Sequence, residues 1–209
     1  MTTRTEEKND NAKYTHMQTH QLAGDILGDA FFHYPLMVYA FKGKTEEERS
    51  KALHHLYRHC AKAAAMYGGV VLIPDKQGAL IWLSGKHFPL GILREAKSGM
   101  AVIPFKIGVK PTVRLMHHDS VPEGWIAKNA GEKMGYIWCL GVAANQRGKG
   151  LSRTLIDQSI ADMRAQGINA FWLKTEDPKN VIIYQKLGFD IVYETVVESS
   201  GIMSWVMKK

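Results

Sequence analysis

The stretch from Tyr136 to Phe189, YIWCLGVAANQRGKGLSRTLIDQSIADMRAQGINAFWLKTEDPKNVIIYQKLGF, decides the fold of this chain. An apolar strand pattern leads into the turn 146–152, and an amphipathic helix pattern follows directly. Glycines in such a turn let the backbone approach a ligand closely, and the first N–H groups of a helix have no partner within it. A helix start attracts phosphate, and Arg147, Lys149 and Arg153 add full positive charges around it. The turn is therefore predicted to bind a pyrophosphate.

The glycine spacing distinguishes this turn from two commoner phosphate-binding loops. A P-loop places Ser or Thr directly after Gly-Lys, whereas Lys149 is followed by Gly150. A dinucleotide fingerprint has a third glycine three residues after Gly150, where Arg153 stands. The pattern instead resembles Arg/Gln-x-x-Gly-x-Gly/Ala, the acyl-coenzyme A loop of the GNAT superfamily of N-acetyltransferases. Arg147, Gly150 and Ser152 occupy its fixed positions, with Ser152 as a small substitute for Gly or Ala.

Length and composition fit a globular protein with a sizeable core. The chain has 209 residues, of which 45% are hydrophobic, and it has no apolar run long enough to span a membrane. The polar residues 1–13 predict a disordered tail and no signal peptide. Cys60 and Cys139 form neither a disulfide pattern nor a Cys-x-x-Cys pair, which favours a cytoplasmic location. The formal charge of +7 suits an anionic ligand such as coenzyme A, and equally suits solubility alone.

The order of the predicted elements indicates an α/β (α+β) fold. The predicted fold resembles that of GNAT proteins, in which a mixed, mostly antiparallel central sheet is flanked by helices. Helices are predicted over 21–32, over 45–68, from the turn 146–152 to about 166, and over 178–187. Strands are predicted over 70–73, 79–83, 136–142, 170–175, 189–197 and 202–207. Residues 14–209 are expected to form a single acetyltransferase domain with an insertion at about 84–133. The insertion is predicted to contain two short helices, near 90–96 and 112–119, and to shape the acceptor site. The layout of the N-terminal half is similar to the puromycin N-acetyltransferase-like branch.

The GNAT resemblance implies a set of site residues. Main-chain groups of Leu140 and Val142 would bind the pantetheine arm, and the N–H of Val142 would polarise the thioester carbonyl. Asn180 would hydrogen-bond the same arm. Residues 180 and 184 share a helical face, so a ligand bound along Asn180 would pass the Tyr184 phenol. By the same resemblance, Tyr184 would protonate the departing thiolate. The pyrophosphate would be bound by the whole turn: Arg147, Gly148, Lys149, Gly150, Leu151 and Ser152.

The general base is not identified by the sequence. An amine acceptor is protonated near neutral pH, so some group must remove a proton. Lys174 stands where related enzymes often have Glu, and Glu176 follows just past the strand. Further candidates are Glu132, His117 and His118.

Metal and nucleic-acid binding are both disfavoured. His55 and His59 are one helical turn apart, but no third ligand lies near them in the sequence, so no metal site is predicted. Trp82, Trp138 and Trp172 could stack on bases, but they fall on predicted strands and are expected to pack in the core.

These observations predict an acetyl-CoA-dependent N-acetyltransferase that moves an acetyl group to a primary amine by direct attack. The acceptor is expected to be a small-molecule or peptide amine, with no membrane or nucleic-acid partner, and the protein a monomer or homodimer. The alternative is a non-catalytic acyl-CoA-binding module of the same fold, acting as a sensor or partner protein. The missing general base favours that alternative, and Tyr184 argues against it.

Overall fold

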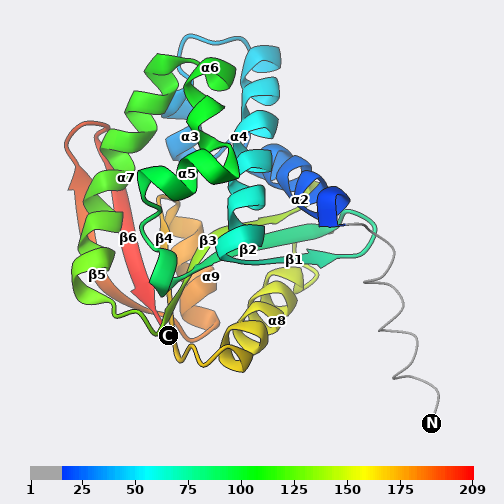
Figure 1. Ribbon diagram of the computed structural model, residues 1–209, viewed down its shortest axis with the longest axis vertical. Coiled ribbons are helices and arrows are strands. Elements are labelled where there is room, and N and C mark those ends of the chain that lie inside the picture. Colours follow the sequence, from blue (N-terminus) through cyan, green and yellow to red (C-terminus); the bar gives the residue numbers. More distant parts are fainter. Residues whose placement is uncertain (1–15) are drawn as a thin grey trace.

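The computed structural model describes residues 16–209, so the predicted tail 1–13 lies outside the described residues. Its central sheet has six strands in the order β1-β2-β3-β4-β6-β5 (Figure 1). Only β3 and β4 are parallel neighbours, and every other neighbouring pair is antiparallel. The predicted mixed, mostly antiparallel sheet flanked by helices is therefore confirmed. The strands are β1 (Gly68–Ile73), β2 (Gly78–Ser84), β3 (Met134–Val142), β4 (Ala170–Thr175), β5 (Asp190–Val197) and β6 (Ile202–Lys208).

Helices cover both faces of the sheet. They are α2 (His16–Ala30), α3 (Pro35–Ala40), α4 (Glu46–Tyr67), α5 (Ile92–Ser98), α6 (Ile103–Ile107), α7 (Val109–Asn129), α8 (Leu151–Ala165) and α9 (Pro178–Lys186), with short 3-10 turns at Gly85–His87, Met100–Val102 and Ala144–Gln146. Successive side chains of β2 point to opposite faces of the sheet and pack in two different cores. Ile81 packs in the core formed by α2, α3 and α4, whereas Leu80 and Trp82 pack with α8 on the opposite face.

Local sequence explains where most elements begin and end. Thr45 and Glu48 form the predicted capping box at the start of α4, and Gly68 follows its last residue. Asp177 caps α9 by accepting a hydrogen bond from the Lys179 amide, and Pro178 occupies the first helical position.

The segment 84–133 is more helical than predicted. The first predicted helix corresponds to α5, but the second, expected near 112–119, extends over the whole of α7. Pro111, Pro122 and Gly124 look like helix breakers in the sequence. Pro111 lies in the first turn of α7, where its missing N–H costs no helical hydrogen bond, and Pro122 is accepted inside the helix. In Figure 1 helices α5–α7 lie together between α4 and the β5–β6 edge of the sheet.

Within residues 16–209 no helix combines the length and apolar character needed to cross a membrane. Cys60 and Cys139 are both buried and unpaired. The cytoplasmic location predicted from these cysteines stays a prediction.

Candidate functional site

The sheet splits between β3 and β4. The two strands pair only from Met134 with Ala170 to Ile137 with Leu173. Beyond that point β3 stays with β2, and β4 stays with β6. A β-bulge at this position of β3 leaves Trp138 without a partner on β2, and bulges increase local strand twist. From Trp138 onward, therefore, β3 has no strand neighbour on its β4 side.

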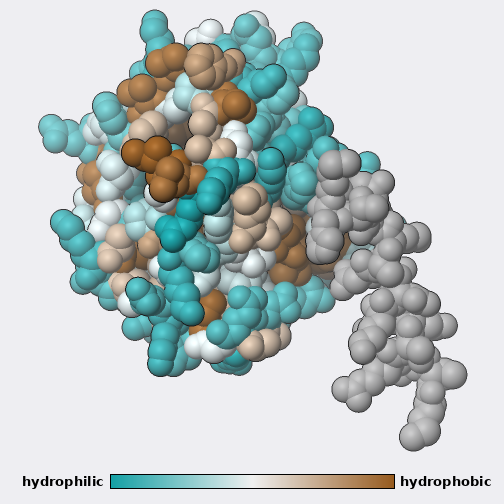
Figure 2. All heavy atoms as spheres, viewed as in Figure 1, coloured by the Kyte–Doolittle hydropathy of each residue, from teal (hydrophilic) through white to brown (hydrophobic). Residues whose placement is uncertain are grey.

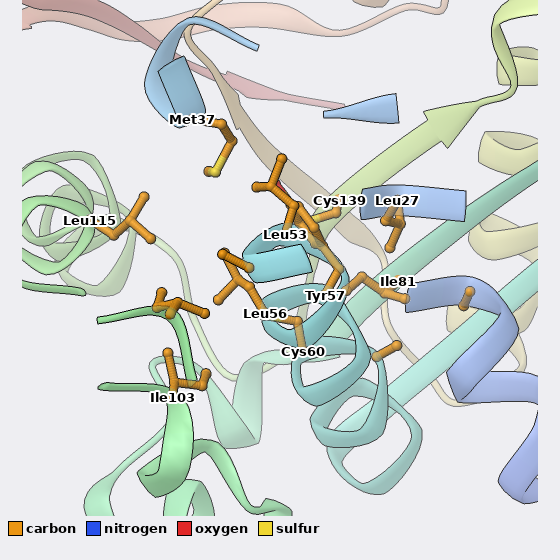
Figure 3. Close-up of a cluster of buried hydrophobic side chains, with 14 of the residues drawn as sticks. Leu27, Met37, Leu53, Leu56, Tyr57, Cys60, Ile81, Ile103, Leu115 and Cys139 are labelled. Atoms are coloured by element: carbon orange, nitrogen blue, oxygen red, sulfur yellow. The ribbon is translucent and has the colours of Figure 1, made fainter. Parts of the chain in front are cut away.

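A cavity of about 580 Å³ lies at this split. Its wall includes Leu140 from β3, Thr175 from β4 and Tyr184 from α9, so residues from both sides of the split line the cavity. Helices α3, α4, α6 and α7 supply many of the apolar wall residues, and Figure 3 shows several of these side chains directed toward a shared space. Among them are Met37, Leu56, Cys60, Ile103 and Leu115.

Apolar side chains are also exposed on helices α5–α7. Figure 2 shows brown side chains gathered over this part of the surface. The most exposed are Ile92, Leu93 and Phe105, at 84%, 78% and 88%. The segment 84–133 thus contributes both to the cavity wall and to an apolar outer surface.

The glycine-rich turn has the backbone geometry of an open anion site. Gly148 and Gly150 have φ values of 81° and 80°, in the left-handed region that favours glycine. No atom lies within 4 Å of where a Cβ would stand on either residue, so the space beside them is open. Helix α8 begins at Leu151 without any side-chain cap, so its first amides point outward without an intrahelical partner.

Charged side chains surround this turn. Arg147, Lys149 and Arg153 are all exposed. Lys149 donates to the Gln146 side chain at 2.8 Å, and Arg153 donates to the Lys186 carbonyl at 3.2 Å. No acidic residue lies in the first turn of α8. The geometry and charge of the turn both suit a phosphate or diphosphate group.

Asn180 and Tyr184 lie one turn apart on α9, and both line the cavity. The Tyr184 ring also packs edge-on against Phe189, with ring centroids 5.9 Å apart. The Tyr184 ring therefore packs against Phe189 and also faces the cavity. Burial raises the pKa of Tyr184, so its hydroxyl keeps its proton at neutral pH.

The two predicted main-chain positions on β3 differ. Leu140 lines the cavity, whereas Val142 is buried in the α8-side core and is not part of the cavity wall. Between them, Gly141 lies against α2, where an added Cβ would come within 2.7 Å of the Ala30 side chain. Leu140 is thus the better placed of the two to contact a ligand in the cavity.

A buried ionic network forms another part of the cavity wall. Lys174 lies 2.8 Å from the Asp119 carboxylate and 3.1 Å from Glu176. Glu176 also accepts hydrogen bonds from Tyr34 at 2.9 Å and from Ser204 at 3.0 Å. Burial alone would raise the pKa of Glu176, but Lys174 and the nearby imidazole of His118 outweigh it and lower that pKa to about 2. Glu176 is therefore a firmly held carboxylate and a weak base.

The other candidate bases do not reach the cavity. His118 is fully buried, with its Nε2 atom 3.4 Å from Glu176 and its Nδ1 atom 2.8 Å from the Ser200 hydroxyl. His117 and Glu132 are exposed, and neither belongs to the cavity wall. Trp125, in the insertion expected to shape the acceptor site, stacks on Tyr193 outside the cavity.

Sequence reasoning missed Glu123. This residue of α7 lines the cavity one turn after Asp119, and it accepts a hydrogen bond from the Tyr136 hydroxyl at 3.1 Å. Burial and the neighbouring Asp119 carboxylate raise the pKa of Glu123 to about 8. The signal that could have revealed it is the spacing of two carboxylates four residues apart, which places both on one face of a helix.

Within the described part of the chain, no group of three or more His, Cys, Asp or Glu side chains is arranged to hold a metal ion. His55 and His59, which have the spacing of a possible metal-binding pair, instead contact each other within α4. His59 bonds the His55 carbonyl through its ring nitrogen at 2.8 Å, so the spacing serves the helix itself.

Comparison with known proteins agrees with this architecture. Residues 112–189 match the Acetyltransferase (GNAT) family, a range that includes β3, the glycine-rich turn, α8, β4 and α9. The chain is 22% identical over 184 residues to the Schizosaccharomyces pombe protein named Uncharacterized N-acetyltransferase C550.08, covering 85% of this chain and 73% of that protein. The family match and the named relative both confirm the predicted resemblance to GNAT acyltransferases.

Two solved structures share the fold over nearly the whole chain. Arylalkylamine N-acetyltransferase 2 from Aedes aegypti superposes with a TM-score of 0.60 at 15% identity, covering 94% of this chain and 96% of that one. The Drosophila melanogaster polyamine N-acetyltransferase superposes with a TM-score of 0.59 at 14% identity, covering 91% and 94%. At these identities the likeness shows the fold alone. The finer likeness to the puromycin N-acetyltransferase-like branch stays a prediction.

Proposed function

We propose that this protein transfers the acetyl group of acetyl-CoA to a primary amine by direct attack, with both substrates bound together. The observation that carries the proposal is that Leu140, Asn180 and Tyr184, each expected from the GNAT resemblance, line one cavity. That cavity lies at a split where β3 offers an unpaired edge.

The parts of the site match the parts of coenzyme A. The uncapped start of α8 and its three surrounding cations suit the diphosphate. The free edge of β3 suits an extended arm with amide groups, which can hydrogen-bond to it as an added strand would. Asn180, on the opposite side of the split, offers an amide side chain to the same arm.

Tyr184 supplies the proton that the reaction needs at the leaving group. Amine attack on the thioester carbonyl forms a C–N bond, and the C–S bond then breaks to release a thiolate. A protonated phenol inside the cavity can donate to that thiolate as it leaves. The two similar structures carry names of amine acetyltransferases, which supports an amine acceptor here.

Thiol release is the measurement that tests this proposal. Purified protein with acetyl-CoA is incubated with a panel of primary amines, and free coenzyme A thiol is followed over time. Release that depends on an amine, with the acetylated amine identified by mass spectrometry, is the expected result. Stabilisation by acetyl-CoA in a thermal melt without any thiol release would favour the non-catalytic binding module instead.

A further inference from the structure

The cavity wall carries more negative than positive charge. Its residues include four carboxylates, Glu95, Asp119, Glu123 and Glu176, but Lys174 is the only Lys or Arg among them. Lys174 is already shared between Asp119 and Glu176, at 2.8 and 3.1 Å. Within residues 16–209, Glu95 and Glu123 therefore have no ion pair of their own.

Glu123 is the carboxylate left over inside this network. Within the described part of the chain, its side chain accepts one hydrogen bond, from the Tyr136 hydroxyl. Glu176, by comparison, has donors from Tyr34, Lys174 and Ser204. A carboxylate removed from water without a cation either takes up a proton or binds a positively charged ligand.

The surroundings of Glu123 agree with this description. The charged and titratable groups that face it are Asp119 on α7, Tyr136 and Cys139 on β3, Lys174 and Glu176 at the end of β4, and Cys60 on α4. Burial, and after it Asp119, raise the pKa of Glu123 to about 8. The pKa of Glu123 thus lies close to neutral pH, and a general base works best when its pKa is near the working pH.

We infer that Glu123 pairs with the ammonium group of a hydrophobic primary monoamine and removes the proton that activates it. This inference rests on the proposed acetyl transfer. The Glu123 carboxylate accepts one proton from the ammonium, and the neutral amine attacks the thioester carbonyl. As the C–S bond breaks, the thiolate takes the Tyr184 proton, and the nitrogen loses its second proton to restore the phenol. Glu123 then releases its proton to solvent, so one proton is produced for each acetyl group transferred.

The rest of the wall defines the body of the acceptor. Aromatic and aliphatic side chains line the cavity around the carboxylates, among them Phe31, Leu56, Phe88, Ile103 and Leu115. Such a wall favours an aryl or alkyl chain and penalises a second ammonium group, which would be removed from water beside apolar side chains. A volume of about 580 Å³ leaves room for the reactive end of the cofactor and a small amine together.

The first test compares acceptors and two matched variants. The acceptors are 2-phenylethylamine, n-hexylamine and spermidine, and the variants are Glu123→Gln and Glu132→Gln. Glu132 is exposed and outside the cavity, so it controls for loss of one negative charge. The two monoamines should have the higher kcat/KM, and Glu123→Gln should lower it for 2-phenylethylamine about 10²-fold or more. Glu132→Gln should behave as the wild type.

The pH dependence of kcat/KM separates a base from a structural residue. In the wild type it should rise with an apparent pKa near 8, because the carboxylate form of Glu123 is the active one. In Glu123→Gln the rise should move toward the pKa of the free amine, about 10, since only amine already deprotonated in solution can react. A residue that only supports the fold would lower the rate without moving this profile.

A measurement without substrate gives an independent readout. Glu123 keeps its proton in the folded state up to about pH 8, whereas in the unfolded chain it loses it near pH 4.5. The folded state then binds more protons between these values, so stability falls as pH rises across that window. Urea unfolding of Glu123→Gln from pH 5 to pH 8 should show a smaller fall than that of the wild type.

The possible failures are distinguishable. Amine-dependent thiol release that Glu123→Gln leaves unchanged, or a clear preference for spermidine, overturns this inference but leaves the acetyl transfer intact. If no amine releases thiol, the proposed function fails. The ammonium pairing is then still tested by calorimetry with 2-phenylethylamine, which should bind the wild type and not folded Glu123→Gln.

Discussion

The two sides of the cavity are built by different means. On one side, residues 134–189 present backbone: β3 has an open edge at the cavity, and the turn before α8, outside the cavity wall, has two left-handed glycines and an uncapped helix start. On the other side, helices α4–α7 present side chains, with a mostly apolar wall and a small set of carboxylates. Backbone groups are the same whatever the sequence, so the first side suits a constant ligand. Side chains can be exchanged one by one, so the second side suits an acceptor that varies between related proteins.

The largest effect is expected from a change on the backbone side. Gly150→Asp places a side chain and a negative charge in the open space where we propose that the diphosphate binds. It should remove the thermal stabilisation by acetyl-CoA completely. Gly201→Asp is the matched control, because Gly201 also has a positive φ, of 70°, and open space around it, but lies in the β5–β6 turn. If both variants keep the stabilisation, the turn is not the diphosphate site.

The next largest effect concerns the ionic network that joins Asp119 of α7 to Lys174 and Glu176 at the end of β4. Lys174→Met leaves the Asp119 and Glu176 carboxylates buried without their shared cation, which should destabilise the protein by about 3–5 kcal/mol. Urea unfolding at pH 7 measures this loss, with the exposed Lys133→Met as control.

The pH dependence of that loss has a definite sign. The folded-state pKa of Glu176 lies at about 2, below the ordinary value of 4.5, so its stabilising contribution is complete above pH 4.5 and disappears toward pH 2. The difference between the wild type and Lys174→Met should therefore shrink as the pH falls below 4.5. A difference that grows on acidification would show that the network does not act through Glu176.

A smaller effect is expected at the point where the two sides meet. Tyr184→Phe keeps the ring that packs on Phe189 but removes the hydroxyl proton. The value of kcat should fall about 10²-fold, equivalent to roughly 2.7 kcal/mol, while acetyl-CoA affinity hardly changes. Tyr193→Phe, outside the cavity, is the control. Wild-type turnover in Tyr184→Phe, measured where chemistry is rate-limiting, would leave this tyrosine a packing role only.

The smallest effect should come from a residue that belongs to neither side. Thr45→Ala removes one of the two hydrogen bonds of the α4 capping box and should cost about 1 kcal/mol of stability. Neither acetyl-CoA affinity nor the KM of the amine should change. Ser50→Ala, one turn further along the same helix, controls for the substitution itself. If Thr45→Ala changes the acetyl-CoA affinity or the KM of the amine, the start of α4 is coupled to the site.

The same contrast explains what could be predicted from sequence. The backbone side follows local rules: glycine at left-handed positions, Asp177 before Pro178, and an apolar strand before a turn. Each of these is determined within a few residues, and the strands, α8 and α9 were predicted close to their observed bounds. Asn180 and Tyr184 were expected from the GNAT resemblance, and both line the cavity because a helix places residues four apart on one face.

The side-chain site could not be predicted in the same way. Pro122 and Gly124 obscured the length of α7, and without that helix Asp119 and Glu123 could not be placed on one face. The contact between Tyr34 and Glu176 joins residues 142 positions apart, which no local pattern encodes. Glu176 was recognised as a candidate, but only its partners reveal that it is too firmly held to be a good base.

The split between β3 and β4 also bears on the stability of the fold. The two halves of the sheet are joined by only four residue pairs, from Met134–Ala170 to Ile137–Leu173. If acetyl-CoA lies in the split as proposed, it acts as a removable part of the fold, and every bound molecule opposes local unfolding there. A starved cell, short of acetyl-CoA, would then contain the same polypeptide with a shorter lifetime, because its loosened interior is open to proteases. Nutrient supply would set the amount of enzyme as well as its rate.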